Sequence, residues 1–242
     1  MKDLTHSIGV IGGGSWGTAL AALLAKKGHG VFLWSRESEV ARDIRELREN
    51  RAFLPGVRLP DTLQAGTDLA EALRGREMVI SVVPSQFVSS VFTRVVEHLD
   101  PGSQIISASK GIEVSTGRRM DEVFSHLLSP EQTHRLTFLS GPSFASEVSA
   151  EAPTAVVVAS RSHSASLRAQ MAFQTEYFRV YTNPDVLGVE LGGALKNVIA
   201  LAAGVVAGMG FGHNTLAALI TRLGTQVDNV IGNLDDVQVV LN

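Results

Sequence analysis

Residues 8–27 read IGVIGGGSWGTALAALLAKK. The first four residues are mostly apolar and predict a buried strand, whereas the alanine-rich run from Ser15 to Lys27 predicts a helix. Between them, Gly12, Gly14 and Gly17 form a G-x-G-x-x-G pattern. In a strand–turn–helix unit the first glycine permits the tight turn, the second lets a pyrophosphate approach the backbone, and the third lets the helix pack close to the strand. A glycine-rich turn alone is a weak signal, but its position between strand and helix favours dinucleotide binding.

The pattern continues outward from this unit as short β-branched runs that alternate with longer charged segments of helical period. Such alternation predicts a parallel sheet with crossover helices, that is, an α/β Rossmann-like doubly wound domain with a mainly parallel sheet. The expected strands are Ile8–Ile11, Val31–Trp34, Met78–Val83, Gln104–Ala108, Leu136–Leu139, Thr154–Ala159 and Phe178–Tyr181. The expected helices are Ser15–Lys27, Glu37–Asn50, Leu69–Leu73, Phe87–His98, Arg118–Leu128, Phe144–Val148 and Ala165–Phe173.

The pattern changes after Asn183-Pro184, where strands give way to a glycine- and alanine-rich sequence of helical period that extends to Ile220. We therefore expect a nucleotide-binding domain at 1–185 and an incomplete, all-helical domain at 186–242. The stretch from Val186 to Gly212 is apolar enough to resemble a membrane span, but charges near the middle of a span are costly in lipid. Since Glu190 and Lys196 interrupt the stretch, we expect a buried helix rather than a membrane segment. From Gly224 to Asn242 no clear period is visible.

Composition narrows the class of protein. Of the 242 residues, 45% are hydrophobic and 19% charged, and the net charge is −3, so neither nucleic-acid nor membrane binding is expected. There is no cysteine, which rules out disulfides, thiolate zinc sites and a cysteine nucleophile. We expect a cytoplasmic protein without a metal site, and the polar start from Met1 to His6 does not read as a signal peptide.

The second expected strand ends at Trp34-Ser35-Arg36-Glu37, where a carboxylate would normally bind the ribose 2′-hydroxyl of NAD. Arg36 could instead receive the 2′-phosphate of NADP. The alternative is that Arg36 is a solvated residue and that Glu37 binds the ribose. The sequence leaves both readings open, and the cofactor is NAD or NADP.

Other polar residues follow later strands. Lys110 and Ser143 lie at strand ends, where ligands bind in open α/β sheets, although each is more often an ordinary turn residue. Lys196 lies between apolar residues on the helix of the second domain. Desolvation there would lower the pKa of the lysine towards that of a general acid or base, whereas a half-buried helix would let the ammonium reach solvent.

Together these segments resemble the bacterial glycerol-3-phosphate dehydrogenase family in order from about residue 7 to residue 223. The matching segments are Val10–Ala21, Val82–Ser85, Ser109–Glu113, Ser140–Ala145, Phe178–Asp185, Leu191–Ala200 and Gly210–Thr215. The family reduces dihydroxyacetone phosphate to sn-glycerol 3-phosphate with NAD(P)H, for glycerophospholipid synthesis. The resemblance also allows a homodimer.

The resemblance assigns roles to residues at matching positions. Lys196 would be the catalytic proton donor to the ketone oxygen. Cofactor contacts would come from the glycines of the turn and from Ser15, Trp16, Arg36, Lys110 and Ala145, with Phe87 a weaker candidate. The substrate site would include Lys110, Gly141, Ser143, Lys196 and Asn197.

The sequence departs from the family after Arg222. The family's Gly-Asp-Leu segment and Ser-Arg-Asn triplet, which clamp the substrate phosphate, do not occur between Leu223 and Asn242. We therefore expect activity impaired by the shortened second domain. Two alternatives remain: a β-hydroxyacid-type dehydrogenase, which the segments at Ser109–Gly111 and Gly212–Thr215 disfavour, and a non-catalytic dinucleotide-binding module.

Overall fold

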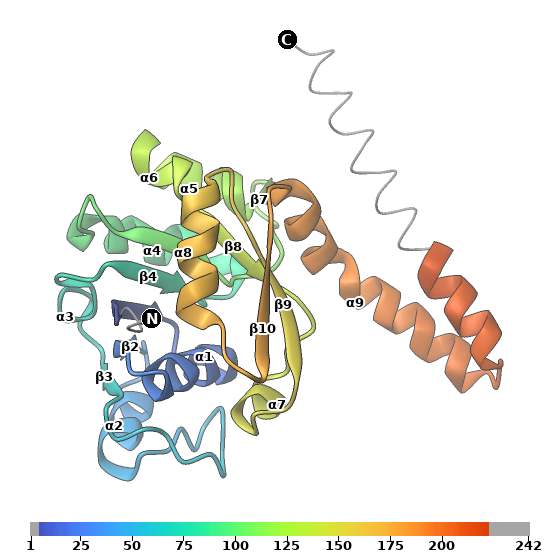
Figure 1. The fold of residues 1–242 in the computed structure, drawn as a ribbon, viewed down its shortest axis with the longest axis horizontal. Coiled ribbons are helices and arrows are strands. Elements are labelled where there is room, and N and C mark those ends of the chain that lie inside the picture. The colour runs from blue at the N-terminus through green and yellow to red at the C-terminus, as the bar shows by residue number, and fades with distance from the viewer. Residues whose placement is uncertain (1–4, 223–242) are drawn as a thin grey trace. The chain divides into compact units, whose positions relative to one another are not determined.

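A computed structural model describes residues 5–222, of which residues 5–186 form one compact unit. An eight-stranded sheet runs through this unit in the order β10-β9-β8-β5-β4-β1-β2-β3 (Figure 1). The strands are β1 Ser7–Ile11, β2 Gly30–Trp34, β3 Gln64–Gly66, β4 Met78–Ser81, β5 Gln104–Ser107, β8 Thr137–Ser140, β9 Thr154–Ala159 and β10 Phe178–Asn183. All neighbouring strands pair in parallel except β8 and β9, which are antiparallel. The expected Rossmann-like, mainly parallel sheet is confirmed.

Helices cover both faces of this sheet. On one face α1 packs against α7 and α8, and on the other α4 packs against α3 and α5. This arrangement follows from right-handed crossovers, because the chain leaves β1 in one direction along the sheet and β4 in the other. The helices of the unit are α1 Ser15–Lys26, α2 Ser38–Leu47, α3 Leu69–Leu73, α4 Val88–Val95, α5 Met120–Leu127, α6 Pro130–His134, α7 Ala145–Ser149 and α8 His163–Phe173, with 3-10 turns η1 Ser85–Phe87 and η2 Val96–His98.

Helix α1 lies in the centre of the hydrophobic core, since every residue from Gly17 to Ala25 is buried. Its four alanines keep the helix surface low, so the backbone lies close to the sheet while Leu20 and Leu24, both fully buried, fill the space between. Burying a leucine side chain contributes about 1.5–3 kcal/mol. The glycine turn at the start of α1 is therefore attached to the best-packed part of the unit.

The expected helix at Glu37–Asn50 is too long in both directions, and its C-terminal end is the larger error. Helix α2 ends at Leu47 because Arg48 adopts the left-handed conformation, with φ 54°. The carbonyl of Arg48 accepts a hydrogen bond from the Leu59 amide at 2.7 Å, and its guanidinium donates to the Leu63 carbonyl at 2.9 Å. Tertiary contacts thus hold a conformation that a non-glycine residue seldom adopts.

Four short elements were not expected: β3, α6 and the two-residue strands β6 Ile112–Glu113 and β7 Arg118–Arg119, which form an antiparallel pair. Helix α6 has a readable signal. Ser129 accepts a hydrogen bond from the Gln132 amide, the Gln132 side chain accepts one from the Ser129 amide, and Pro130 occupies the first turn. This capping box was visible in the sequence.

The second unit begins at Leu187, the second residue of α9, and is helical, as expected. It contains α9 Val186–Gly208 and further helix at residues 213–222. By length and composition α9 could cross a membrane, with a mean hydropathy of 1.6, and only 6% of that apolar window is buried in the described chain. The expectation of a buried helix is therefore wrong for the described residues. An apolar sequence favours burial, but burial needs elements packed around the helix, which composition alone does not supply. The stretch from Gly224 to Asn242 lies outside the described residues.

Candidate functional site

The three glycines of the G-x-G-x-x-G turn meet three different steric conditions. At Gly12, with φ +128°, a Cβ atom would lie 2.6 Å from the carbonyl oxygen of Val82. A Cβ at Gly17 would lie 1.9 Å from the carbonyl oxygen of Gly12, so the helix can start this close to the strand only with glycine there. A Cβ at Gly14 would meet nothing within 4 Å. The first and third glycines therefore allow internal packing, whereas the second faces open space, as pyrophosphate approach requires.

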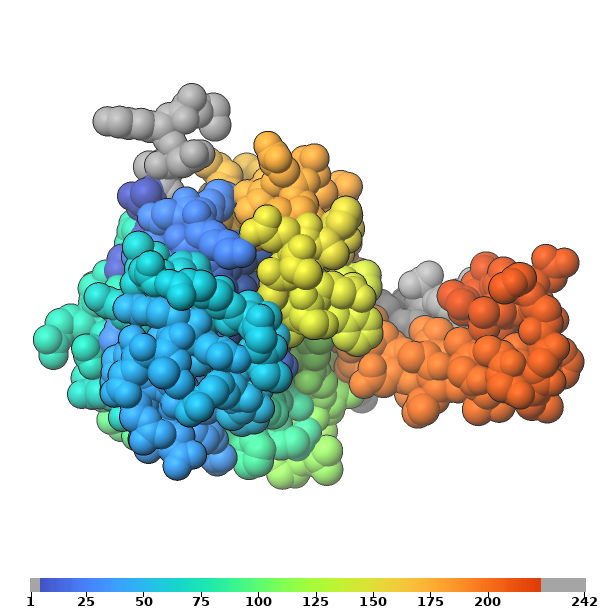
Figure 2. Space-filling model, turned by 90° about the horizontal axis from the view of Figure 1, so that it is seen from below, coloured from blue at the N-terminus to red at the C-terminus, as the bar shows by residue number. Residues whose placement is uncertain are grey.

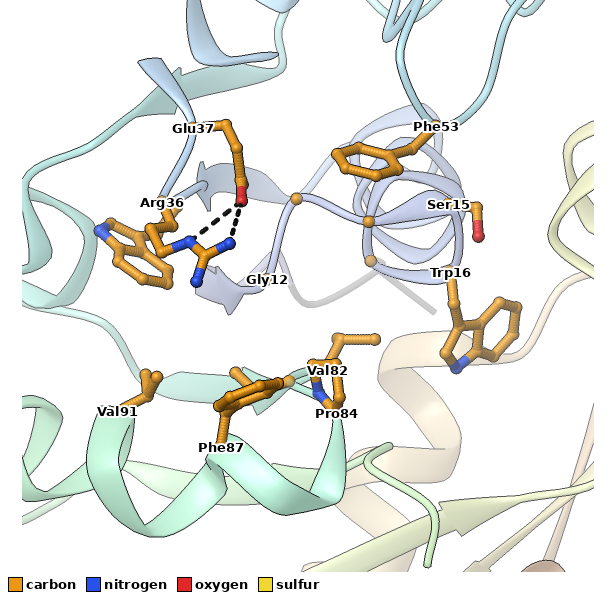
Figure 3. Close-up of a pocket in the computed structure, with 15 residues that line it drawn as sticks. Gly12, Ser15, Trp16, Arg36, Glu37, Phe53, Val82, Pro84, Phe87 and Val91 are labelled. Atoms are coloured by element: carbon orange, nitrogen blue, oxygen red, sulfur yellow. Dashed lines mark hydrogen bonds and ion pairs between the residues drawn. The ribbon is translucent and has the colours of Figure 1, made fainter. Parts of the chain in front are cut away.

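A pocket of about 370 Å³ opens at this turn, between the carboxyl ends of β1 and β4. These strands are where the strand order reverses, which is where open α/β sheets bind ligands. Helix α1 begins here without a side-chain cap, so its first-turn N–H groups and positive dipole end can receive an anion. The lining residues are Gly12–Gly17, Trp34, Arg36, Glu37, Phe53, Val82, Val83, Pro84, Phe87 and Val91 (Figure 3).

The end of β2 brings Ser35, Arg36 and Glu37 to one side of this pocket. Ser35 is buried against the glycine turn, where a Cβ on Gly13 would come within 2.6 Å of its side chain. The Arg36 guanidinium donates to Glu37 Oε1 from Nε at 3.1 Å and from Nη2 at 2.9 Å (Figure 3). Ser35 Oγ donates to Glu37 Oε2 at 3.0 Å.

Partial burial raises the pKa of the Glu37 carboxyl, but the hydrogen bonds from Arg36, the Glu37 backbone and Ser35 together with the Arg36 charge outweigh it and hold that pKa below its usual value. Glu37 is therefore ionised at neutral pH. The sequence left open whether Arg36 or Glu37 contacts the ribose of the cofactor; in the structure the two side chains form an ion pair with each other.

Lys110 follows β5 and joins a second group of polar residues. Its Nζ donates to the carbonyl of Gly141 at 3.1 Å and lies 5.8 Å from the ring centroid of Trp16. An ammonium at this distance from an indole is attracted by the ring electrons. Ser143 Oγ donates to the same Gly141 carbonyl at 3.4 Å. Residues expected to bind cofactor and residues expected to bind substrate thus lie next to one another in the first unit.

Two glycines with positive φ angles, Gly111 and Gly141, shape the backbone around Lys110 and Ser143. Gly111, beside Lys110, has φ +124°, and a Cβ there would lie 2.8 Å from Ser85 Oγ. Gly141 has φ +150°, and a Cβ there would press on the β9 backbone, 2.9 Å from the Val156 Cα. Only glycine accepts these conformations readily. Ala145 begins α7 after this turn and does not line the pocket.

Lys196 and Asn197 belong to the second unit, on α9, and both side chains are exposed there. The apolar neighbours of Lys196 in the sequence do not desolvate it in the described chain, since Val198 is 60% exposed and Leu201 72% exposed. Of the two readings left open for this lysine, the structure supports an ammonium that reaches solvent. Its catalytic role stays a prediction.

Phe53 is a pocket residue that the sequence reading missed. It lies on the loop after α2, is 44% exposed, and projects over the glycine turn from the wall opposite Phe87 and Pro84 (Figure 3). Phe87, expected only as a weaker candidate, also lines the pocket. The sequence offered one indication of Phe53: it is an aromatic residue in the loop between α2 and β3, close in sequence to the residues that follow β2.

Comparison with known proteins gives a consistent result. Residues 7–166 match the family model described as NAD-dependent glycerol-3-phosphate dehydrogenase N-terminus, and residues 185–236 match the C-terminus model of the same family. The glycerol-3-phosphate dehydrogenase [NAD(P)+] of Citrifermentans bemidjiense is 56% identical over 219 residues, and that of a Geobacter strain is 55% identical over 219 residues. Each alignment covers 90% of this chain but 65% of the relative, so the chain spans just under two thirds of the length of these relatives.

Solved structures agree with this assignment. The glycerol-3-phosphate dehydrogenase of Coxiella burnetii superposes with a TM-score of 0.84 at 38% identity, covering 95% of this chain and 70% of that one. The Plasmodium falciparum enzyme superposes with a TM-score of 0.82 at 28% identity, covering 93% and 66%. The glycine turn, the Lys110 group and these matches together show that the chain belongs to the NAD-dependent glycerol-3-phosphate dehydrogenase family.

Proposed function

We propose that this chain binds NAD(H) or NADP(H) over Gly14 and takes part in the reduction of dihydroxyacetone phosphate to sn-glycerol 3-phosphate. The observation that carries the proposal is the glycine turn, in which Gly12 and Gly17 are needed for packing while Gly14 faces the open pocket. This division matches the requirements of a bound pyrophosphate. A bound nicotinamide cofactor would supply the hydride.

The chain's own residues would position the reactants and supply a proton. Backbone N–H groups at the start of α1 would bind the pyrophosphate, and Phe53 and Phe87 would form apolar walls on either side of the cofactor. Lys110 would place positive charge near Trp16 and Gly141, at one end of the nucleotide pocket, where it can attract an anionic substrate. By resemblance to the family, Lys196 would donate the proton to the ketone oxygen, and Gly141, Ser143, Ala145 and Asn197 would complete the cofactor and substrate contacts.

The Ser-Arg-Asn triplet that clamps the substrate phosphate in the family does not occur among these 242 residues, so the proposal assigns no residue to that task. The family match does not favour a β-hydroxyacid-type dehydrogenase. A chain that binds cofactor without turning over substrate is the second candidate, and an activity assay separates it from the first. The cysteine-free composition fits a reducing cytoplasm, and product formation would feed glycerophospholipid synthesis.

The proposal is tested by titrating the protein with NADH and with NADPH. Trp16 and Trp34 both line the pocket, so quenching of their fluorescence reports occupancy. Saturable quenching is expected for at least one cofactor, and Gly14→Leu should abolish it without unfolding the protein, since a Cβ atom at Gly14 meets no protein atom within 4 Å and a leucine there would extend into the space above the turn. Absence of saturable binding in the folded wild-type protein would refute the proposal.

A further inference from the structure

Asn50 is a fully buried amide that the catalytic proposal does not use. It follows the end of α2 and has an exposed fraction of 0%. Its Nδ2 donates to the Gly13 carbonyl at 2.9 Å and to Thr18 Oγ1 at 2.8 Å. Its Oδ1 accepts a hydrogen bond from the Phe53 amide at 3.1 Å. Both hydrogens of the carboxamide are therefore used on the glycine turn and α1, and its oxygen is used on the Phe53 loop.

These bonds connect two walls of the nucleotide pocket that are far apart in the sequence. Gly13 lies in the turn over which the pyrophosphate would bind, and Phe53 projects over that turn from the loop (Figure 3). The Leu54 amide donates to the Asn50 carbonyl at 2.8 Å, which closes a tight turn around Phe53. In Figure 2 the blue and cyan segments, which include α2 and the loop after it, form one continuous surface. The loop is thus tied to the turn through one side chain.

A carboxamide is well suited to this task because it offers two donors and an acceptor in one plane. The Gly13 carbonyl and the Thr18 hydroxyl are acceptors, and the Phe53 amide is a donor, so the group is matched on every side. An aspartate or leucine of similar size would leave the Gly13 carbonyl without this donor. The three hydrogen bonds of Asn50 hold the Phe53 backbone in place beside the glycine turn without a ligand. A pocket wall that is already ordered lowers the entropic cost of cofactor binding.

We propose that Asn50 is a positioning residue for cofactor binding, which acts by tying the Phe53 loop to the glycine turn so that both walls of the pocket are set in advance. This inference rests on the proposed function, since it concerns the same pocket. It adds a role for a residue that touches no ligand. The proposed role can be distinguished from a purely structural one. Replacing a buried amide that only supports the fold should lower stability without weakening cofactor binding.

Gln104 provides a matched control. It lies on β5, is 2% exposed, and its Nε2 donates to one hydroxyl and one carbonyl, Thr137 Oγ1 at 3.0 Å and the Ala165 carbonyl at 2.8 Å. Like the Asn50 amide, the Gln104 amide donates to one hydroxyl and one carbonyl. Gln104 does not line the nucleotide pocket, however. Gln104→Met removes two buried hydrogen bonds, and Asn50→Leu removes three, including the one from the Phe53 amide, so both should lower the melting temperature.

The experiment measures cofactor dissociation constants for Asn50→Leu, Gln104→Met, Phe53→Leu and the Asn50→Leu/Phe53→Leu double variant. Asn50→Leu is expected to weaken binding roughly tenfold, the effect of losing a buried hydrogen-bond donor, whereas Gln104→Met should stay within about twofold of wild type. Phe53→Leu should weaken binding about fivefold alone and much less in the Asn50→Leu background, because the loop is already released there.

Equal binding by Asn50→Leu and wild type, or additive effects in the double variant, would overturn the inference. If Asn50→Leu does not fold, Thr18→Val answers the same question by removing one acceptor at constant volume, with about a threefold loss expected and no loss contradicting the inference. Wild-type protein that binds neither cofactor would instead refute the proposed function and this inference with it.

Discussion

Replacing Arg36 by alanine is expected to weaken NADPH binding far more than NADH binding. The Arg36 side chain is 79% exposed beside the pocket, with its guanidinium in a two-point contact with Glu37. Glu37 is itself 40% exposed, so the pair is screened by solvent and stabilises the fold by no more than about 1 kcal/mol. A 2′-phosphate could therefore take the guanidinium from Glu37 at small cost.

The gain from that exchange sets the expected effect. Hydrogen bonds to charged groups contribute about 1.5–3 kcal/mol, so Arg36→Ala should weaken NADPH binding by roughly 10- to 150-fold. Glu37→Gln is the matched variant: it removes the competing charge and should tighten NADPH binding up to about fivefold, the equivalent of 1 kcal/mol. If Glu37 also binds the ribose hydroxyl, the same variant should weaken NADH.

Both cofactors are titrated by tryptophan quenching at one fixed ionic strength, with the melting temperature as the control for folding. Because contacts to a phosphate are screened by salt, the NADPH preference of the wild type should shrink as salt is raised. Equal losses for NADH and NADPH in Arg36→Ala would show that Arg36 does not read the 2′ position. An unchanged NADPH affinity in Glu37→Gln would show that the pair does not compete with the cofactor.

Three further outcomes are expected. Gly17→Ala should lower the melting temperature sharply, because its Cβ would lie 1.9 Å from a carbonyl oxygen, whereas Gly14→Ala should leave it near wild type; similar melting temperatures would contradict the two roles. Dihydroxyacetone phosphate reductase activity, followed in a spectrophotometric NAD(P)H assay, should be lost in Lys196→Ala, and turnover unaffected by that substitution would count against the proposed proton donor. The Glu77 pKa is lowered, chiefly by a backbone N–H hydrogen bond, so its stabilisation is present above the pH at which an ordinary glutamate titrates and is lost as pH falls. Urea unfolding at pH 6 and pH 4 should therefore show a smaller loss for Glu77→Gln than for wild type, and parallel losses would refute the assignment.

Local sequence patterns determined most of the first unit. The strand Thr154–Ala159 and the helix Leu69–Leu73 occur with the predicted bounds, because β-branched runs and helical apolar spacing act over a few residues. The glycine turn was also readable, since its spacing encodes steric conditions that only glycine meets. The order of strands and helices then implied a doubly wound sheet through the handedness of crossovers.

Tertiary structure decided features that depend on residues distant in sequence. Strand β9 pairs antiparallel with β8, although its apolar run looks like that of a parallel strand. Arg48 ends α2 in a left-handed conformation held by contacts with residues 59 and 63. Burial of α9 could not be read from its apolar sequence either, because burial depends on what packs around a helix.

The site divides in the same way. Gly12, Gly14 and Gly17 could be assigned from their spacing, because a strand–turn–helix unit needs glycine at these three places, although the atom that excludes a side chain at Gly12 belongs to Val82. The contact of Lys110 with Gly141 joins residues 31 positions apart, and that of Asn50 with Gly13 joins residues 37 positions apart. Such contacts depend on how strand ends and loops converge in space, and a linear pattern does not contain the distances between them.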